Sequence, residues 1–585
     1  MKKLLVANRG EIALRIMRSA RELGLEIVAV YSEIDRAALH VAYADEAYLL
    51  GPATPSQSYL NVEKLLDVAA RSGADAVHPG YGFLAENAGF ARAVTAAGLV
   101  WVGPHADAID AMGDKIRSRQ AMVAAGVPVV PGATEPLRSI EDALRAADEY
   151  GLPLALKASG GGGGKGLKVA RTRDEIATAF ATAEREAQAY FNNATLYVER
   201  YLDNPKHVEL QLLADKHGNV VHIGERDCSL QRRHQKLYEE TPARIPESVR
   251  ERLREAGIRA AKAIAYDSVG TIETLVAGDE FFFLEMNTRI QVEHTISEMT
   301  SGIDLIAEQL RVAAGEPLGY TQRDVKFRGH SIEVRVNAED PAQNFRPEPG
   351  KITAYREPAG FGVRVDAAAT LGGTISPEYD SMIAKLIVWA PTRDRARARL
   401  RRAIDDYEIG GVPTTLEFLR ALNDSPAVAE GTFGTATLEA FAATWTPARN
   451  GVAHDVEPPA DAAPPGDGSE IVRVEVNDKL YTVRVLDRPA PRAPAAASRK
   501  PAPKAQRAKN GRVADGNDIV APMHGVVVDV TVDAGTEVVA GQVIAVIEAM
   551  KMMNEIRAHR AGTVAAVHAA KGTTLEAGAP ILTLA

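Results

Sequence analysis

Short apolar runs alternate with stretches of helical spacing at the start of the chain. The strand candidates are residues 4–7, 27–31 and 99–102, and the helix candidates are residues 12–23 and 62–70. Parallel strands need a helical crossover between them, so this alternation predicts a doubly wound, mostly parallel sheet. We therefore expect an α/β domain over residues 1–112.

Beyond residue 112 the pattern changes several times, and each change predicts a boundary. Residues 113 to about 203 contain the glycine-rich segment, and residues 204–446 mix strands and helices in an α+β manner. Ala and Pro dominate residues 447–517, which lack the apolar content for a core and predict a linker. Within it, alternating Val and charged residues predict a small β-hairpin at 471–487.

The last stretch, residues 518–585, repeats itself at an offset of 37 residues. Three pairs of glycines carry the repeat, namely Gly525 and Gly562, Gly535 and Gly572, and Gly541 and Gly578. Both halves contain short Val- and Ile-rich runs between glycines, which predicts a small all-β domain with internal pseudo-twofold symmetry. The segment 549–554 joins the halves, and we expect it to be an exposed hairpin tip that presents Lys551 between two methionines. An ordinary solvated turn lysine is the alternative.

Composition narrows the class of protein. The chain has 585 residues with a formal net charge of −9, which gives no basic surface for nucleic acid or an anionic membrane. No apolar run is long enough to cross a bilayer, and the single cysteine, Cys228, excludes a disulfide scaffold. We expect a soluble, cytoplasmic protein in which Cys228 is a buried, inert thiol.

Five consecutive glycines lie between two lysines, Lys157 and Lys165. Glycines let backbone amides approach a phosphate closely, and lysines neutralise its charge. The order of residues differs from a Walker A loop, which requires a Ser or Thr directly after its Gly-Lys pair. Because strand-like runs flank the glycines, we predict a hairpin that closes over phosphate, and a flexible linker is the alternative.

A polar row follows the apolar run Phe281–Leu284. Its members occupy alternate positions: Glu285, Asn287, Arg289, Gln291 and Glu293. At a period of two they would project from one face of a continuing strand. Together with Glu273, the oxygen ligands Glu285 and Asn287 would suit Mg²⁺ or Mn²⁺.

Several motifs together resemble the biotin carboxylase family of the ATP-grasp superfamily. They are the segments 7–13, 78–84, 112–115, 226–236 and 285–294. The segments 521–525 and 548–552 resemble biotinyl carrier domains, whose signature is Ala-Met-Lys-Met; a lipoyl carrier shares the fold but not the methionines. The whole chain resembles the biotinylated alpha subunits of actinobacterial acyl-CoA carboxylases. This implies a biotin carboxylase N-terminal domain over residues 1–112 and an ATP-grasp domain over 113–325 with a glycine-rich lid at about 130–203. It also implies a biotin carboxylase C-terminal domain over 326–446 and a hammerhead, lipoyl-like biotinyl domain over 518–585.

The resemblance also implies roles for individual residues. The ATP-binding residues would be Lys115, Lys157, Gly163, Gly164, Glu199, Leu202, His207, Gln231 and His234. The bicarbonate-binding residues would be Lys236, Arg289, Gln291 and Val292, and the metal ligands Glu273, Glu285 and Asn287. Catalysis would rest on Glu293 as general base, on Arg289 and Lys236, and on Arg335, which would face biotin. Lys551 would carry the covalent biotin.

The implied reaction is ATP- and bicarbonate-dependent carboxylation of that biotin. No stretch is left for a carboxyltransferase, so the carboxyl group would pass to a separate beta subunit that acts on acetyl-CoA or propionyl-CoA. A biotin protein ligase and homo-oligomerisation within a larger complex are further implied. Pyruvate or another acceptor, and a carrier scaffold with a silent ATP-grasp domain, are the alternatives. One departure is visible: the family continues His-Pro-Val-Thr where this chain has His294-Thr295-Ile296-Ser297.

Overall fold

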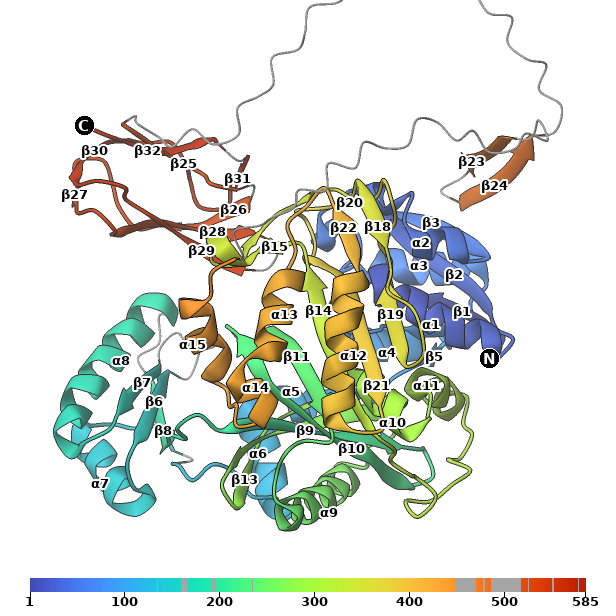
Figure 1. The fold of residues 1–585 in the computed structure, drawn as a ribbon, viewed down its shortest axis with the longest axis horizontal. Coiled ribbons are helices and arrows are strands. Elements are labelled where there is room, and N and C mark those ends of the chain that lie inside the picture. The colour runs from blue at the N-terminus through green and yellow to red at the C-terminus, as the bar shows by residue number, and fades with distance from the viewer. Residues whose placement is uncertain are drawn as a thin grey trace, which may run out of the picture. The chain divides into compact units, whose positions relative to one another are not determined.

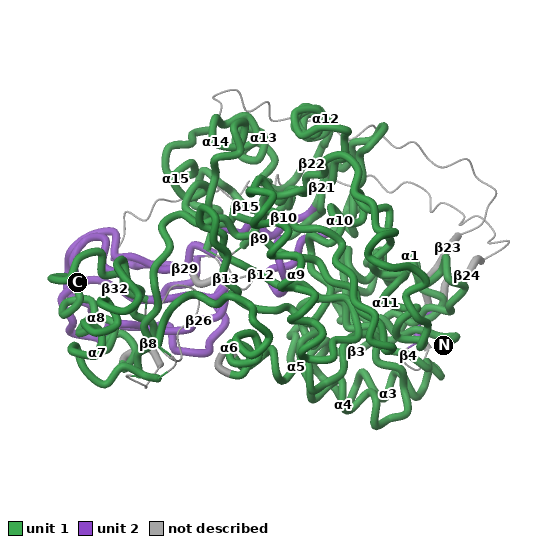
Figure 2. The backbone as a smooth tube through the Cα atoms, turned by 90° about the horizontal axis from the view of Figure 1, so that it is seen from below, with its two compact units in different colours: residues 1–345, 352–373, 382–451 green, residues 346–351, 374–381, 452–585 purple. Residues whose placement is uncertain are grey.

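The computed structural model forms two compact units (Figure 2). The first comprises residues 1–345, 352–373 and the described part of 382–451, and the second comprises residues 346–351, 374–381 and the described residues beyond 452. The described residues are 1–133, 135–158, 167–191, 195–233, 235–447, 470–476, 479–485, 517–523, 525–549, 552–576 and 578–585.

The first unit begins with the expected parallel sheet, whose strand order is β3-β2-β1-β4-β5 (Figure 1). Its strands are β1 (Lys3–Val6), β2 (Glu26–Ser32), β3 (Glu46–Gly51), β4 (Ala76–His78) and β5 (Val100–Trp101). The helices of this part are α1 (Gly10–Glu22), α2 (Leu39–Tyr43), α3 (Val62–Ser72), α4 (Ala88–Ala96) and α5 (Ala106–Gly113). Leu4, Leu5 and Val6 are fully buried, as the apolar run at the start of the chain predicts.

A small three-stranded sheet follows, with its own core. After α6 (Lys115–Ala124), its elements are α7 (Ile140–Tyr150), β6 (Leu154–Ala158), β7 (Leu167–Ala170), α8 (Ile176–Phe191) and β8 (Leu196–Arg200). Apolar residues of both helices pack against Leu154, Leu156 and Val198 of the sheet. The strands β6 and β7 pair antiparallel with Lys157 opposite Leu167, so the two strands predicted to flank the glycines form a hairpin.

One eight-stranded sheet organises the rest of the first unit, in the order β13-β12-β9-β10-β11-β14-β21-β19. Its strands are β9 (Lys206–Ala214), β10 (Val220–Arg232), β11 (Gln235–Thr241), β12 (Val269–Ala277), β13 (Glu280–Asn287), β14 (His330–Asn337), β19 (Val363–Ala367) and β21 (Met382–Ala390). Neighbouring strands pair antiparallel throughout. The pairing of β11 with β14 carries the sheet across the boundary expected near residue 325.

Helices pack against this sheet (Figure 1). Among the remaining helices, those that contact its strands are α9 (Glu247–Ala263), α10 (His294–Ser301), α12 (Arg393–Asp406) and α15 (Thr437–Thr444). Of the others, α11 (Leu305–Ala313) packs against α1, α13 (Leu416–Asp424) packs against α12, and α14 (Pro426–Glu430) packs against α13. The short strands of the first unit are β15 (Glu339–Asp340), β18 (Ala354–Arg356) and β22 (Glu408–Gly410), and those of the second unit are β16 (Arg346–Pro347), β17 (Gly350–Lys351) and β20 (Thr374–Ile375). Val249, Leu253 and Ala256 of α9 join a core with Leu210 of β9 and Phe283 of β13, so α9 covers the half of the sheet that leads to the polar row.

The second unit contains the hairpin and the repeat expected from the sequence. The strands β23 (Glu470–Val476) and β24 (Lys479–Val485) pair antiparallel. The repeat forms two four-stranded sheets, β25-β32-β30-β27 and β29-β28-β26-β31. Their strands are β25 (Asp518–Val520), β26 (Gly525–Val530), β27 (Glu537–Val538), β28 (Val543–Ala549), β29 (Met552–Arg557), β30 (Gly562–Val567), β31 (Thr574–Leu575) and β32 (Pro580–Leu584).

The offset of 37 residues maps strand onto strand: β26 onto β30 and β27 onto β31, residue for residue. The paired turn glycines share their backbone conformation. Gly535 and Gly572 have φ of +90° and +86°, and Gly541 and Gly578 have +85° and +88°, values that favour glycine over residues with a side chain. The predicted pseudo-twofold symmetry is therefore present in the backbone.

Among the described residues, no helix combines the length and the apolar character needed to cross a membrane.

Candidate active site

One cavity of about 640 Å³ in the first unit brings the predicted site residues together. It is lined by Lys157, Glu199, Leu202, His207, Gln231, Lys236, Glu273, Glu285, Asn287, Arg289, Gln291, Val292, Glu293 and Arg335. These residues come from the lid strand β6, from β8 and the segment after it, from six strands of the large sheet (β9 to β14) and from the turn after β13. Residues spread over almost 180 positions of the sequence thus face one space.

Four predicted residues lie outside the described part of the chain: Gly163, Gly164, His234 and Lys551. Lys115 begins α6, but its side chain is likewise not described. For Lys551 the neighbouring strands are informative. β28 and β29 pair antiparallel as far as Ala549 opposite Met552, and the predicted carrier lysine falls in the sequence between these two strands.

The polar row after the Phe triplet does not continue as a strand, and that prediction was wrong. β13 ends at Asn287, residues 288–293 form a turn, and α10 begins at His294. A bulge where β13 pairs with β12 leaves both Leu284 and Glu285 exposed. All five polar residues of the row still line the cavity, because the turn carries Arg289, Gln291 and Glu293 back to the side on which Glu285 and Asn287 project.

Glu293 is only 1% exposed and lies between two cations. Its Oε1 is 2.8 Å from Lys236 Nζ, and its Oε2 accepts a hydrogen bond of 2.8 Å from Arg335 Nη2. Burial alone would raise the pKa of this carboxyl, but Lys236 and then Arg335 hold the pKa of Glu293 well below its usual range. Glu293 is therefore ionised at neutral pH, as a general base must be.

Lys236 is the cation at the centre of the site. Besides Glu293 it contacts Glu273, at 3.1 Å, and Glu209. Burial would lower the pKa of Lys236, but the three carboxylates, Glu209 first, hold it well above its usual range. An anion that binds Lys236 must therefore compete with carboxylates of the protein itself.

Glu209 is a site residue that the sequence reasoning missed. It is fully buried on β9, and its Oε2 accepts a hydrogen bond of 2.9 Å from Arg226, which is also fully buried. Arg226 in turn donates to the side-chain oxygen of Gln291 at 2.6 Å. A signal was available, because His207, Glu209 and Gln211 put polar side chains at every second position of an otherwise apolar strand.

The predicted metal ligands cluster around one carboxylate. Glu273 Oε1 accepts hydrogen bonds of 2.7 Å from Asn287 and from Gln291, and its Oε2 is 2.8 Å from His207 Nε2. Glu285 lies opposite Glu273 in the register of β12 and β13. Partial loss of hydration around the Glu285 carboxyl raises its pKa, and the nearby Glu273 carboxylate raises this pKa further. Two carboxylates that repel each other next to the Asn287 amide, whose oxygen accepts a hydrogen bond from Arg289, form a donor set that fits Mg²⁺ or Mn²⁺.

Arg289 is positioned by a second residue that the sequence reasoning missed. Its Nε donates to Glu86 Oε2 at 2.9 Å, and its Nη2 donates to Asn287 Oδ1 at 2.8 Å. Glu86 belongs to the N-terminal α/β part, between β4 and α4. The carboxylate that orients Arg289 thus comes from about 200 residues earlier in the chain, a contact that no local pattern could predict.

On the lid side of the cavity, Lys157 of β6 forms an ion pair with Glu199 of β8. Both were predicted to bind ATP. Gln231 Nε2 is 3.2 Å from His207 Nδ1, so two further predicted ATP contacts also touch each other.

His78 and Cys228 have structural and not catalytic roles, and for Cys228 this confirms the expectation of a buried, inert thiol. His78 is fully buried and its Nδ1 accepts a hydrogen bond of 3.0 Å from the backbone amide of Gly80, which supports the turn after β4. Burial lowers the pKa of His78 to about 3, so the ring is neutral. Cys228 is buried, and burial followed by the nearby Glu209 carboxylate raises the pKa of its thiol well above the usual value. Cys228 is therefore no nucleophile at neutral pH.

The departure from the family motif has a structural counterpart. Thr295, which stands where the family has proline, donates its hydroxyl hydrogen bond to the buried carboxylate of Glu333 on β14. The start of α10 is thereby tied to the large sheet by a side-chain hydrogen bond.

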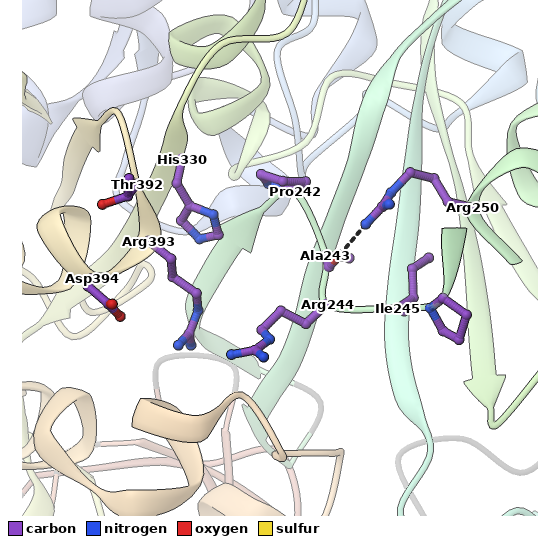
Figure 3. A pocket seen from close by; sticks show the side chains of 10 residues that line it. Pro242, Ala243, Arg244, Ile245, Arg250, His330, Thr392, Arg393 and Asp394 are labelled. Carbon is purple, nitrogen blue, oxygen red and sulfur yellow. Dashed lines mark hydrogen bonds between the residues drawn. The ribbon is translucent and has the colours of Figure 1, made fainter. Parts of the chain in front are cut away.

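A second cavity of about 630 Å³ lies elsewhere in the first unit, at the end of β11 and the start of α12 (Figure 3). Arginines line it, but two of them already have protein partners. Arg393 donates to Glu240 at 3.0 Å, and Arg250 donates to Glu225 at 2.7 Å and to the carbonyl of Ala243 at 2.7 Å. This cavity contains none of the predicted site residues.

Family models match along most of the chain. The biotin carboxylase N-terminal domain matches residues 1–109, the ATP-binding domain of the carbamoyl-phosphate synthase L chain matches 114–321, and the biotin carboxylase C-terminal domain matches 333–440. The model described as biotin-requiring enzyme matches 517–584.

Curated relatives and solved structures agree with these matches. The biotin-dependent acyl-coenzyme A carboxylase alpha3 subunit of Mycobacterium leprae is 44% identical over 98% of this chain and 97% of its own. One of the pyruvate carboxylase subunits of Methanothermobacter thermautotrophicus is 51% identical over 73% of this chain and 88% of its own. The biotin carboxylase domain of Hydrogenobacter thermophilus 2-oxoglutarate carboxylase, solved with MgADP and bicarbonate, superposes with a TM-score of 0.69 at 49% identity and covers 75% of this chain and 97% of that one.

Proposed function

The chain belongs to the biotin carboxylase family, and we propose that it uses ATP and bicarbonate to carboxylate biotin held on its own Lys551. ATP-dependent biotin carboxylation is the activity of the family, and a biotin-requiring domain is part of the same chain. The observation that carries the residue assignment is the placement of Glu293 between Lys236 and Arg335, at 2.8 Å from each, in a cavity shared with the predicted ATP and metal ligands.

In the proposed reaction, bicarbonate binds among Lys236, Arg289, Gln291 and the backbone of Val292. Glu293 accepts the bicarbonate proton, and the freed oxygen attacks the γ-phosphorus of ATP, so that ADP leaves and carboxyphosphate forms. A bicarbonate that recruits Lys236 removes one of the cations that lower the pKa of Glu293. Binding of the substrate therefore makes the base stronger at the moment when it is needed.

The remaining assignments concern groups that bind alongside bicarbonate. Lys115, Lys157, Gly163 and Gly164 would contact the phosphates of ATP, and Glu199 and Leu202 its adenine, with His207, Gln231 and His234 completing the nucleotide site. A divalent cation held by Glu273, Glu285 and Asn287 would neutralise charge on the phosphates. Carboxyphosphate would break down to CO₂ and phosphate, the phosphate would accept the ureido proton of biotin, and the ureido nitrogen would bond to the CO₂ while the ureido oxygen faces Arg335. A biotin protein ligase would attach the biotin to Lys551.

We further propose that the acceptor of the carboxyl group is an acyl-CoA of the acetyl or propionyl class, bound by a separate carboxyltransferase subunit. The support is the extent of similarity: the acyl-CoA carboxylase alpha3 subunit matches 98% of this chain, carrier domain included. The matches to chains named for pyruvate and 2-oxoglutarate cover 73–75% of it. Pyruvate remains the alternative acceptor, because the pyruvate carboxylase subunit has the higher sequence identity to this chain, 51% against 44% for the acyl-CoA carboxylase subunit.

Two measurements test these proposals separately. Phosphate release from ATP should require bicarbonate and should accelerate with free biotin; a chain that releases no phosphate under these conditions is a carrier scaffold only. The biotinylated chain, co-purified with its carboxyltransferase partner, should then fix labelled bicarbonate into acetyl-CoA or propionyl-CoA. Label that enters pyruvate instead would refute the acyl-CoA assignment and leave the first half-reaction intact.

A further inference from the structure

Lys385 is a fully buried lysine beside the active site that the proposed mechanism does not use. It lies on β21 with none of its surface exposed. Its Nζ donates a hydrogen bond of 3.0 Å to the backbone carbonyl of Val292, the residue before the base Glu293. Lysine is rarely buried completely, because removing an ammonium from water is costly unless partners compensate. The position of Lys385 therefore calls for an explanation.

The partners of Lys385 come from parts that are distant in the sequence. Its Nζ is 3.3 Å from Glu11 Oε2 on α1 and 3.9 Å from Asp366 Oδ2 on β19. Tyr81, whose hydroxyl donates to the same Glu11, presents its ring 5.9 Å from Nζ. The ammonium is thus compensated from the N-terminal α/β part and from the large sheet, and it directs a hydrogen bond to the turn that carries the base.

The register of the sheet pairs this lysine with the arginine that holds the base. Lys385 on β21 lies directly opposite Arg335 on β14, and residues opposite each other in an antiparallel pair project from the same face. The two cations hold consecutive residues of the turn: Arg335 binds the carboxylate of Glu293, and Lys385 binds the carbonyl of Val292. One contact is made to a side chain and the other to the backbone.

We propose that Lys385 is a positioning residue that keeps Glu293 in place while Arg335 is engaged by biotin. The inference rests on the proposed function, in which Arg335 faces the ureido oxygen of biotin. Arg335 then divides its donors between biotin and Glu293, and the turn loses part of its attachment to β14. The bond from Lys385 to the Val292 carbonyl does not involve the carboxylate, so it persists through this exchange.

This role predicts that the importance of Lys385 depends on biotin. Without biotin, Arg335 still holds Glu293, and carboxyphosphate can form with the turn attached at both points. With biotin, the end of the turn at Val292 and Glu293 depends on Lys385, whereas Gln291 stays bonded to Arg226. If Lys385 only stabilised the fold, its replacement would lower phosphate release with biotin and without biotin by the same factor.

The experiment uses the full chain with Lys551→Arg, so that free biotin is the only biotin present. Lys385→Met removes the ammonium and keeps the length of the side chain, and Glu11→Gln is added so that no buried carboxylate is left uncompensated. Phosphate release from ATP is measured with bicarbonate alone and with bicarbonate plus saturating biotin. We expect the biotin-stimulated rate to fall at least tenfold in Lys385→Met/Glu11→Gln and the rate without biotin to stay within threefold.

Two control variants accompany it. Glu11→Gln alone keeps Lys385 and should preserve the ratio of the two rates. Arg393→Met/Glu240→Gln removes a comparable buried ion pair at the second cavity and should also preserve that ratio. Rates that fall in parallel in the Lys385 variant, or a biotin-stimulated rate within threefold, would overturn the positioning role. A parent chain that biotin does not stimulate would instead refute the proposed function, which separates the two failures.

Discussion

Replacement of Glu293 by glutamine tests the assignment of the general base with little change in shape. The variant keeps the size of the side chain but cannot accept the bicarbonate proton. The cations around it retain other carboxylates, because Lys236 still contacts Glu209 and Glu273, and Arg335 still contacts Glu239 at 2.8 Å. Since no buried charge is left alone, we expect a cost in folding stability of only about 1–3 kcal/mol.

The expected loss of activity is much larger. General base catalysis contributes about 10²- to 10⁴-fold to a rate, so phosphate release by Glu293→Gln should fall by that factor. The affinity for ATP, measured by calorimetric titration, should stay within about threefold of wild type. Turnover within tenfold of wild type would refute the assignment of Glu293 as the base.

Glu239→Gln is the matched control, because Glu239 also binds Arg335 but is not in contact with Lys236 through any ion pair of the described residues. Burial raises the pKa of Glu239 to about 7, so this carboxyl is already partly protonated at neutral pH. We expect its replacement to slow turnover by no more than about fivefold. Equal losses in the two variants would mean that Arg335, and not the base, accounts for the effect of Glu293→Gln.

Three further variants test other parts of the site. Lys551→Arg should abolish biotinylation, read by avidin blotting, while turnover of free biotin persists; label that remains would place the biotin elsewhere. Glu285→Gln should raise the Mg²⁺ concentration for half-maximal phosphate release by about tenfold or more, and an unchanged Mg²⁺ dependence would exclude Glu285 as a ligand. Burial raises the pKa of Glu11 from 4.5 to about 7, so its ionisation reduces folding stability as the pH rises between these values. Denaturant titrations should therefore show Glu11→Gln gaining about 3 kcal/mol relative to wild type from pH 4.5 to pH 8; a pH-independent difference would refute the shift.

The sequence predicted the fold well where local chemistry determines it. The glycines repeated at an offset of 37 residues locate the turns of the carrier domain, because Gly535, Gly541 and their equivalents adopt a φ that favours glycine. The strands of the N-terminal sheet follow from apolar runs such as residues 27–31, which are fully buried. Each of these features depends on a few neighbouring residues.

The site was harder to predict where contacts join distant segments. The partners of Arg226 lie on β9, on β12, in the turn after β13 and on α10, a set that only the strand order brings together. Glu86 and Lys385 are further examples, because nothing near them in the sequence indicates that they meet Arg289 or Val292. The alternation from Glu285 to Glu293 gave the right residues for a wrong reason, since a turn produces the convergence that we attributed to a strand.

These contacts share a property that bears on how the site works. Lys236, Arg289 and Lys157 are each predicted to bind an anionic substrate, and each is paired with a carboxylate of the protein: Glu293, Glu86 and Glu199 respectively. When ATP and bicarbonate bind, each of these cations exchanges a carboxylate of the protein for an oxygen of the substrate. The charge of the cation therefore adds less to substrate affinity than it would if the cation were unpaired. The exchange also changes the displaced carboxylates, because each of them loses a cation that favours its ionised form. For Glu293 that loss raises the affinity for a proton, so the step that binds bicarbonate also prepares the group that deprotonates it. A site with unpaired cations would bind bicarbonate more tightly but would leave its base as weak after binding as before.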